Sequence, residues 1–521
     1  MPKLTIGVID LVAKAPIRTL WMRVMGANFA GIMPQVVASW CEQEGHDVTL
    51  ITYTGRENLL GLLPQKVDLV FISSFTEAAL LSYALSNLLR SRGAVTALGG
   101  PHARCYPQDA QKHFDYVMGF TDKSLVERVT QDCSRYRPAG QILSAARHPN
   151  NLPGVRERWK FIDQTLSKAP LMKFVPLLSS LGCPYSCDFC IDSSVPFMPL
   201  DSEAMKEDLR FLLGKLKHPR VAWHDPNFGV RFDECLDAIE EVVPPGRIDF
   251  IAESTLSLLS EDRVKRLARN GFKAMLPGIE SWFEMGKKSR TGKATGMDKV
   301  KNVSDRTNMI LRYIPYVQTN HILGLDSDHS SDPFELTKRF LDLSPGAFPA
   351  YSLLSAFGQA APQNLAFQRD NRVMPIPFHF LSNAQMNMKP RNYSWLQFYD
   401  YLIDLTKYSY SPSLILRRFI ANRETIPRWL NLVRGLSSER LSRVAYFSEI
   451  RLRLKTDRPF RRFFEQETTD IPEYFKDRIR RDLGHFWEWL PPGAICHDPN
   501  AYLASAGSAD NAVGPPSVGI A

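Results

Sequence analysis

The sequence predicts an α/β protein in which an N-terminal doubly wound parallel sheet precedes a full or partial (βα)6 barrel and a helical C-terminal region. Three observations lead to this prediction. Short β-favouring runs alternate with helical patterns over residues 3–133, and the alternation returns over residues 174–357. Such alternation is typical of parallel sheets whose faces are covered by helices. The 521 residues also make three or four compact units at about 150 residues per domain.

Residues 1–133 are predicted to form the first domain, with strands over 4–10, 47–53, 68–74 and 94–99 and helices over 30–44 and 76–91. Ligands of such a sheet bind beyond the carboxyl ends of its strands, where glycine lets the backbone approach a ligand closely. The residues expected at this rim, after two neighbouring strands, are Ser73, Ser74, Thr76, Gly99, Gly100 and His102.

Four further regions follow along the chain. Residues 134–170 contain four prolines and are predicted to be a linker. Residues 171–360 are predicted to form the barrel, with strands over 174–180, 220–225, 249–255, 273–280, 316–324 and 350–357. The chemistry of such a barrel gathers at the carboxyl ends of its strands. Residues 361–495 are first aromatic and then basic and helical, and the Gly-, Pro- and Ser-rich segment 496–521 is predicted to be disordered.

The composition is that of a globular protein. Hydrophobic residues make up 44% and charged residues 23%, which excludes a collagenous, coiled-coil or disordered chain. No apolar run reaches the roughly 18 residues of a spanning helix, so we expect a cytoplasmic protein without a transmembrane segment. The net charge of +9 does not by itself indicate nucleic acid, and no such partner is expected. The excess basic residues gather between Leu414 and Arg481. They form either a solvated helical surface or a contact with an anionic substrate or membrane.

Three of the eight cysteines crowd into the segment LGCPYSCDFC, residues 181–190. Cys183, Cys187 and Cys190 have the spacing C-x-x-x-C-x-x-C and follow the first predicted barrel strand. Three thiolates on one loop can hold three irons of a [4Fe–4S] cluster and leave the fourth iron open. The alternative is a structural zinc site, which needs four closed ligands and usually a second cysteine pair.

This motif, with aromatic Phe189 just before the last cysteine, resembles the signature of the radical S-adenosylmethionine (SAM) enzymes. The resemblance implies that the open iron binds the amino and carboxylate groups of SAM. It also implies that an electron from the cluster cleaves SAM to a 5′-deoxyadenosyl radical. The cofactor then carries the difficult chemistry, while the protein orients it and excludes water.

The resemblance further implies SAM-binding roles at the ends of the barrel strands for Asp225 in HDPNF, Glu253 in FIAEST, Glu280 and Ser281 in GIES, and Gly324 and Asp328 in HILGLDSD. Asp225 would bind the methionyl ammonium, and Glu280 would accept hydrogen bonds from the ribose hydroxyls. HDPNF departs from the Gly-Gly-Glu form of many members, and Asp328 stands where glutamate is usual. For Asp225 and Glu253, hydrogen bonding to the loop backbone is the structural alternative.

The first domain resembles the cobalamin-binding domain that precedes the barrel in one branch of this family. The resemblance rests on ISSFT (72–76), GGPHA (99–103) and DYVMGF (115–120), and it places the nucleotide tail of cobalamin on the rim residues. The Asp-x-His-x-x-Gly motif that supplies a cobalt ligand in some cobalamin proteins is absent, because Asp10 is followed by Leu11 and Val12. The alternative to cobalamin binding is that the first domain serves only as a scaffold or lid.

These resemblances imply an enzyme with a [4Fe–4S] cluster, SAM and cobalamin that methylates an unactivated carbon. A radical cyclase or oxidative enzyme without methyl transfer is the first alternative, and a non-enzymatic redox or cobalamin sensor is the second. The aromatic segment with Phe378, Phe380, Trp395, Phe398 and Tyr401 either lines a pocket for a lipid, terpenoid or aromatic substrate or forms the core of a covering helical layer. An electron donor such as flavodoxin or ferredoxin is expected.

Overall fold

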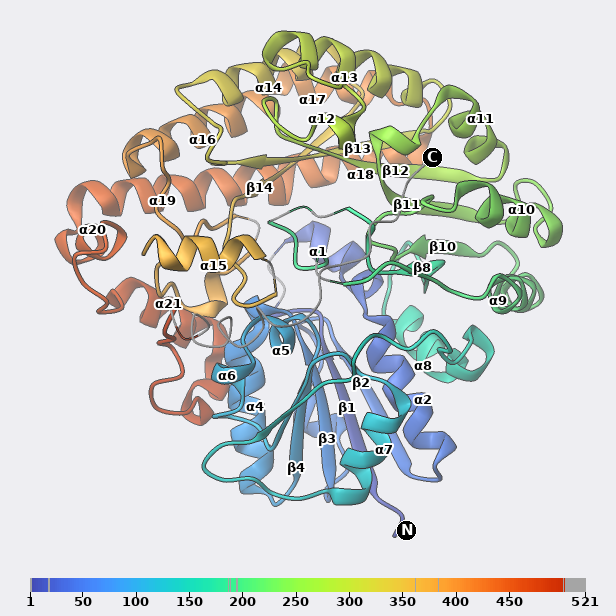
Figure 1. The fold of residues 1–521 in the computed structure, drawn as a ribbon, viewed down its shortest axis with the longest axis vertical. Coiled ribbons are helices and arrows are strands. Elements are labelled where there is room, and N and C mark those ends of the chain that lie inside the picture. The colour runs from blue at the N-terminus through green and yellow to red at the C-terminus, as the bar shows by residue number, and fades with distance from the viewer. Residues whose placement is uncertain are drawn as a thin grey trace.

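A computed structural model describes residues 2–16, 19–185, 187, 189–193, 195–360, 362–382, 384–499 and 501. It contains two six-stranded parallel sheets, the first formed by residues 5–143 and the second by residues 175–353, and a helical C-terminal region that lies against both (Figure 1). The predicted fold class is confirmed. Within the described residues, no helix is long and apolar enough to cross a membrane.

The first sheet has the strand order β2-β1-β3-β4-β5-β6. Its strands are β1 (Thr5–Leu11), β2 (Asp47–Tyr53), β3 (Leu69–Ser74), β4 (Val95–Gly99), β5 (Tyr116–Met118) and β6 (Gln141–Leu143). The inner strands are buried along nearly their whole length, as expected of strands covered on both faces. The accompanying helices are α1 (Leu20–Met25), η1 (Gly26–Phe29), α2 (Ile32–Gln43), α3 (Leu59–Leu62), η2 (Thr76–Ala78), α4 (Ala79–Ser91), α5 (Pro101–Cys105), α6 (Pro107–Ala110) and α7 (Lys123–Asp132).

The segment 134–170 is more ordered than a simple linker. It supplies the edge strand β6 to the first sheet and then forms helix α8 (Val155–Ser167). Helix α8 buries Phe161 and Ile162, one against each of two adjoining cores. The prolines that suggested a linker lie outside both elements, because proline cannot donate to a ladder or helix bond.

The second sheet is the predicted six-unit barrel, open between its first and last strands, in the order β14-β13-β12-β11-β10-β7. Its strands are β7 (Val175–Leu177), β10 (Arg220–Trp223), β11 (Asp249–Thr255), β12 (Phe272–Glu280), β13 (Tyr316–Leu323) and β14 (Phe348–Leu353). A small antiparallel pair, β8 (Ser180–Leu181) and β9 (Met198–Pro199), follows the first strand. The helices of this half are α9 (Ser202–Lys215), α10 (Phe232–Val242), η3 (Leu256–Leu258), α11 (Glu261–Arg269), α12 (Gly286–Ser289), α13 (Gly296–Leu311) and α14 (Asp332–Leu343).

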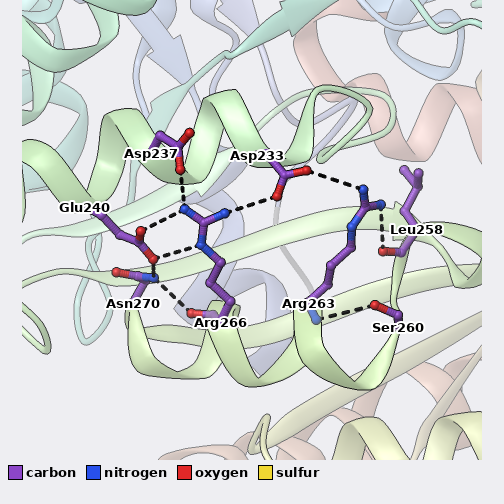
Figure 2. A network of polar contacts seen from close by, with 8 residues as sticks. All are labelled: Asp233, Asp237, Glu240, Leu258, Ser260, Arg263, Arg266 and Asn270. Carbon is purple, nitrogen blue, oxygen red and sulfur yellow. Dashed lines mark hydrogen bonds and ion pairs between the residues drawn. The ribbon is translucent and has the colours of Figure 1, made fainter.

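Helices α10 and α11, on the outside of the barrel, are joined by a network of charges around Arg266 (Figure 2). The Arg266 guanidinium pairs with Asp233 at 3.1 Å, with Glu240 at 2.7 Å and with Asp237. Three carboxylates of one helix thus converge on one arginine of the next. The network holds two neighbouring βα units in register on the solvent side.

The C-terminal region consists of α15 (Pro362–Arg369), η4 (Phe378–Phe380), α16 (Trp395–Ser409), α17 (Pro412–Ala421), α18 (Thr425–Arg434), η5 (Gly435–Ser442), α19 (Arg443–Thr456), α20 (Arg458–Phe464), α21 (Glu473–Leu483) and η6 (Gly484–Trp489). Its buried aromatic residues, among them Phe378, Trp395 and Phe398, share one core with helix α4 of the first domain. The aromatic segment therefore forms the core of a covering helical layer, which was one of its two predicted roles.

The C-terminal segment 496–521 was predicted to be disordered from its composition. His497 instead is buried, with its ring 4.2 Å from that of Phe378. Residue 500 and residues 502–521 lie outside the described residues.

Candidate functional site

The three cysteines lie on the loop between β8 and β9. Gly182 opens this loop with a φ of +68°, and a Cβ there would lie 2.3 Å from the Pro196 carbonyl oxygen, so only glycine fits. The N–H of Cys190 donates to the Cys187 carbonyl at 2.9 Å, which turns the loop back on itself. All three thiols are half-buried, and burial raises the pKa of Cys183 and Cys190.

A cation lies beside these thiols. The Lys288 ammonium pairs with the Glu280 carboxylate, with 2.5 Å between Nζ and Oε1. Burial alone would lower the pKa of Lys288, but Glu280 and the thiols of Cys187 and Cys190 together raise it. The backbone N–H of Asp192 also donates to the Cys190 sulfur at 3.4 Å. The site thus combines three thiols with a positive charge and a backbone donor.

Glu253 supplies a second carboxylate one strand away, on β11. Its side chain is exposed to an open cavity and is surrounded by protein on its other sides. This enclosure raises the pKa of Glu253; the charge of Glu280 adds to the rise, and Lys288 opposes it. Glu253, Glu280 and Lys288 therefore form one electrostatically coupled group at the carboxyl ends of β11 and β12.

Asp225, predicted to bind the methionyl ammonium, follows strand β10 and is buried. Its carboxylate accepts hydrogen bonds from the hydroxyls of Ser179 at 2.6 Å and Ser180 at 2.7 Å, and from the Ser179 N–H at 3.0 Å. Burial raises its pKa. Asp225 thus holds Ser179 and Ser180, just before the cysteine loop, and its contact with SAM stays a prediction.

The remaining predicted SAM residues shape the backbone at two strand ends. The Ser281 hydroxyl accepts from two backbone N–H groups of the turn after β12, at 3.1 and 3.2 Å. The Asp328 carboxylate accepts from the Gly324 N–H at 2.9 Å and from the next N–H at 3.1 Å. Gly324 has a φ of +86°, and a Cβ there would lie 3.0 Å from the Phe398 ring. Burial raises the pKa of Asp328 to about 7.

The rim of the first sheet is built from the ends of β3 and β4, which point towards the second sheet (Figure 1). Gly100 has a φ of +86°, and a Cβ there would lie 3.0 Å from both the Ser73 hydroxyl and the Ser74 backbone. A Cβ on Gly99 would meet no atom within 4 Å. Ser74 and Thr76 are buried, and Ser74 donates its hydroxyl to the next carbonyl. Ser73 and Gly99 are therefore the open part of the rim.

His102 is in the core beneath this rim and not on its open side. Its Nε2 lies 2.6 Å from the Tyr83 hydroxyl, and its ring is 4.9 Å from that of Phe378. Burial lowers the pKa of His102 to about 3, and His497 and His113 add to this effect. In this arrangement His102 organises the turn after β4 and does not face a ligand.

The first domain touches the cysteine loop directly. Arg104, on α5 after the rim glycines, pairs with Asp192 of the cysteine loop, with 3.1 Å between Nη2 and Oδ1. Because Asp192 in turn donates its N–H to Cys190, a short bonded path joins the rim to the thiols. The two sites that the sequence predicted separately therefore lie side by side.

Comparisons with known proteins agree with this geometry, although no family model matches the chain. Bacteriochlorophyllide d C-12(1)-methyltransferase of Chlorobaculum tepidum is 24% identical over 362 residues, which cover 67% of this chain and 76% of that enzyme. Among solved structures, the cobalamin-dependent radical SAM enzyme OxsB covers 96% of this chain and 83% of its own, at 12% identity and a TM-score of 0.55. The radical SAM methyltransferase TsrM of Kitasatospora setae covers 75% and 80%, at 12% identity and a TM-score of 0.52.

The chain is thus similar in sequence to bacteriochlorophyllide methyltransferases and in fold to cobalamin-dependent radical SAM enzymes. The predicted fold is confirmed, and the similarity to these enzymes agrees with the predicted family and enzyme class. A second relative, the C-8(2)-methyltransferase of the same organism, is 24% identical over 234 residues, which cover 41% of this chain and 50% of that enzyme.

The cysteine loop fits a [4Fe–4S] cluster. Within the described ranges, no three His, Cys, Asp or Glu side chains are arranged to hold a single metal ion. A cluster takes each thiolate on a different iron, so its three sulfurs need not converge on one point. The N–H donated to Cys190 and the cation of Lys288 match the negative charge of such a cluster. Phe189 packs against the core shared with the first domain and anchors the loop.

The binding sites for SAM and cobalamin fit less completely. Glu280, Glu253 and Lys288 provide charges that match the ammonium, carboxylate and ribose of SAM. For cobalamin, Gly99 leaves open space in front of the rim, and Ser73 adds a hydroxyl beside it. The strand-end residues Ser74, Thr76 and His102 are already used in the domain's own packing.

A cavity of about 300 Å³ runs along the inner face of the barrel from the amino ends of its strands to Glu253. Its walls are mostly apolar, with Ile251 and Leu276 of the barrel on one side. Residues from η1 and α18, including Phe29 and Ile426, close the other side. The inner end of the cavity therefore borders the charged group of the SAM site.

Sequence reasoning missed three residues of this site: Lys288, Asp192 and Arg104. Lys288 lies eight positions after Glu280, on α12, and no motif of the sequence singled it out. Asp192 and Arg104 come from different domains, so only their contact shows their importance. The position of Asp192 two residues after the last cysteine was the one available signal.

Proposed function

We propose that this enzyme transfers a methyl group to a carbon atom of a large apolar ring compound of the tetrapyrrole class. The Arg104–Asp192 pair is the main support for methyl transfer, because it brings the predicted cobalamin rim next to the cysteine loop. The substrate class is supported by the relatives, which act on bacteriochlorophyllides, and by the apolar cavity that ends at Glu253. This class extends the aromatic substrate expected from the sequence.

The chain's own residues have separable tasks in this proposal. Cys183, Cys187 and Cys190 would hold the cluster, while Glu280 and Lys288 would orient SAM within the barrel. When bound, the cluster and SAM supply a radical that removes a hydrogen atom from carbon, and cobalamin supplies the methyl group. Ile251 and Leu276 would exclude water from the reacting carbon.

The enzyme, purified without oxygen from cells supplied with cobalamin, tests the proposal directly. We expect about four irons and about one cobalamin per chain. With bacteriochlorophyllide d as the probe substrate and a chemical reductant, we expect 5′-deoxyadenosine, S-adenosylhomocysteine and a substrate product heavier by one methyl group.

Two controls separate the parts of this proposal. Cys187→Ala should abolish iron binding and all products, since three thiolates are needed for an open cluster. Cys496→Ala, at an exposed cysteine far along the chain, should change neither. Formation of 5′-deoxyadenosine without S-adenosylhomocysteine would contradict methyl transfer and favour the cyclase or oxidative alternative.

A further inference from the structure

Helices α17 and α18 and the start of η5 expose an unusual number of large apolar side chains. Ile420 is 66% exposed and Trp429 is 54% exposed, and Leu416, Ile426 and Leu436 are also exposed. We call these five residues the apolar face. Leu416 and Ile420 are four positions apart on one helix, and Ile426 and Trp429 are three apart on the next, so each pair lies on one side of its helix. The Phe419 and Trp429 rings, 5.4 Å apart, join the two helices.

Basic residues surround this face. The segment 412–443 contains seven arginines and two glutamates, a net charge of +5 in a chain whose total is +9. Among the residues that the structure describes, exposed Arg423 and half-buried Arg440 form no ion pair. Exposed apolar side chains with an interfacial tryptophan and unpaired arginines are the pattern of a surface that lies on an anionic bilayer.

The cavity of the barrel opens at the same place. Phe29 and Ile426 both line the cavity, and both are about half exposed, at 46% and 49%. They therefore stand at its mouth, and Ile426 belongs to the apolar face as well. Leu20, on the helix α1 that contacts α18, extends the exposed apolar surface beside this mouth.

We propose that the apolar face docks this enzyme on anionic membrane surfaces, with the mouth of the cavity turned towards the lipid. Apolar side chains at the mouth would insert among the acyl chains, while Arg423 and Arg440 would bind the lipid phosphates. A lipophilic molecule dissolved in the bilayer would then enter the barrel without crossing water. Only this last step rests on the proposed function, because docking itself does not depend on turnover.

Vesicle sedimentation with the full-length protein tests the docking. We expect the protein to sediment with vesicles of phosphatidylglycerol and phosphatidylcholine, more weakly at high salt, and hardly at all with phosphatidylcholine alone. The double variant Ile420→Thr/Trp429→Gln should bind the anionic vesicles about tenfold or more weakly. Arg423→Gln and Arg440→Gln should each weaken binding about fivefold.

Ile142→Thr is the matched control, because Ile142 is also an exposed isoleucine, at 43%, but lies on β6 at the far edge of the first sheet. It should bind vesicles as the unchanged protein does. Iron content and the thermal midpoint should be equal in all variants, which shows that the fold is kept.

Two results would overturn the proposal. One is anionic-vesicle binding that is absent or is unchanged in the double variant. The other is a dimer in solution that Trp429→Gln dissociates, since the apolar face would then be covered by a second copy of the chain. Failure of methyl transfer with normal vesicle binding would contradict the proposed function alone.

Discussion

Lys288 balances the negative charges of the candidate site. It is the cation that offsets Glu280, Glu253 and the thiols of Cys187 and Cys190. We expect Lys288→Met to raise the dissociation constant for SAM about tenfold or more and to lower stability by about 3 kcal/mol, because a largely buried ion pair loses one partner. Lys287→Met, on the exposed neighbour, should change neither. SAM titration and thermal unfolding measure both effects, and an unchanged affinity would contradict the role of Lys288.

Asp328 gives the enzyme a pH dependence of its own. Burial raises its pKa from 3.8 to about 7, so the folded protein keeps a proton that the unfolded chain loses near pH 4. Stability from this group is therefore full at acidic pH and falls as pH rises from about 4 to 7. The shift corresponds to a change on the order of 4 kcal/mol.

Asp328→Asn keeps an oxygen acceptor for the Gly324 N–H but removes the titration. We expect this variant to have a higher thermal midpoint than the unchanged protein at pH 8, and the difference to shrink at pH 5. A difference of equal size at both values would show that Asp328 is charged in the fold. Asp326→Asn, at a partly exposed neighbour that pairs with Arg372, serves as the control.

At the scale of elements, the charge network of Figure 2 decides how firmly α10 and α11 are joined. We expect Arg266→Ala to lower stability by about 1 kcal/mol, because a single arginine gathers three otherwise repelling carboxylates. The loss should diminish in high salt, which screens exposed charges. Arg269→Ala, on the exposed side of the same helix, should have little effect. Thermal midpoints at low and high salt measure this, and a salt-independent loss would point to packing instead.

The alternation of strands and helices was predicted closely from the sequence because each element buries its own repeating face. Strands β2 and β11 have the bounds that the sequence predicted, 47–53 and 249–255. The edge strand β6 was missed, since its three residues are polar or half exposed and pair only at the margin of the sheet. Such a strand depends on its neighbour and not on a pattern of its own.

For the molecule as a whole, the first domain and the C-terminal helices share one core. Phe378 lies between His102 of the first domain and His497 near the C-terminus, at ring distances of 4.9 and 4.2 Å. The Asn87 side chain on α4 also donates to the Trp489 carbonyl at 2.9 Å. The two regions should therefore fold and unfold together.

Phe378→Ala tests this shared core. We expect a loss of about 3–5 kcal/mol, because a fully buried ring is removed from between two regions. Residues 1–133 expressed alone should be insoluble, since the apolar side of α4 would be exposed. Phe75→Ala, at an exposed phenylalanine of the same domain, should leave stability nearly unchanged. A soluble, folded fragment would show that the first domain has its own sufficient core.

The sequence by itself determined the elements, their order and the cysteine motif, because hydrophobic periodicity and ligand spacing are local properties of a chain. It also pointed to Glu280 and Glu253 through the ends of the strands that carry them. Only the tertiary structure decided that Asp225 binds Ser179 and Ser180 before the cysteine loop, that His102 is buried and that Arg104 meets Asp192. These outcomes depend on which distant groups share a site, and burial and charge act through space and not along the chain.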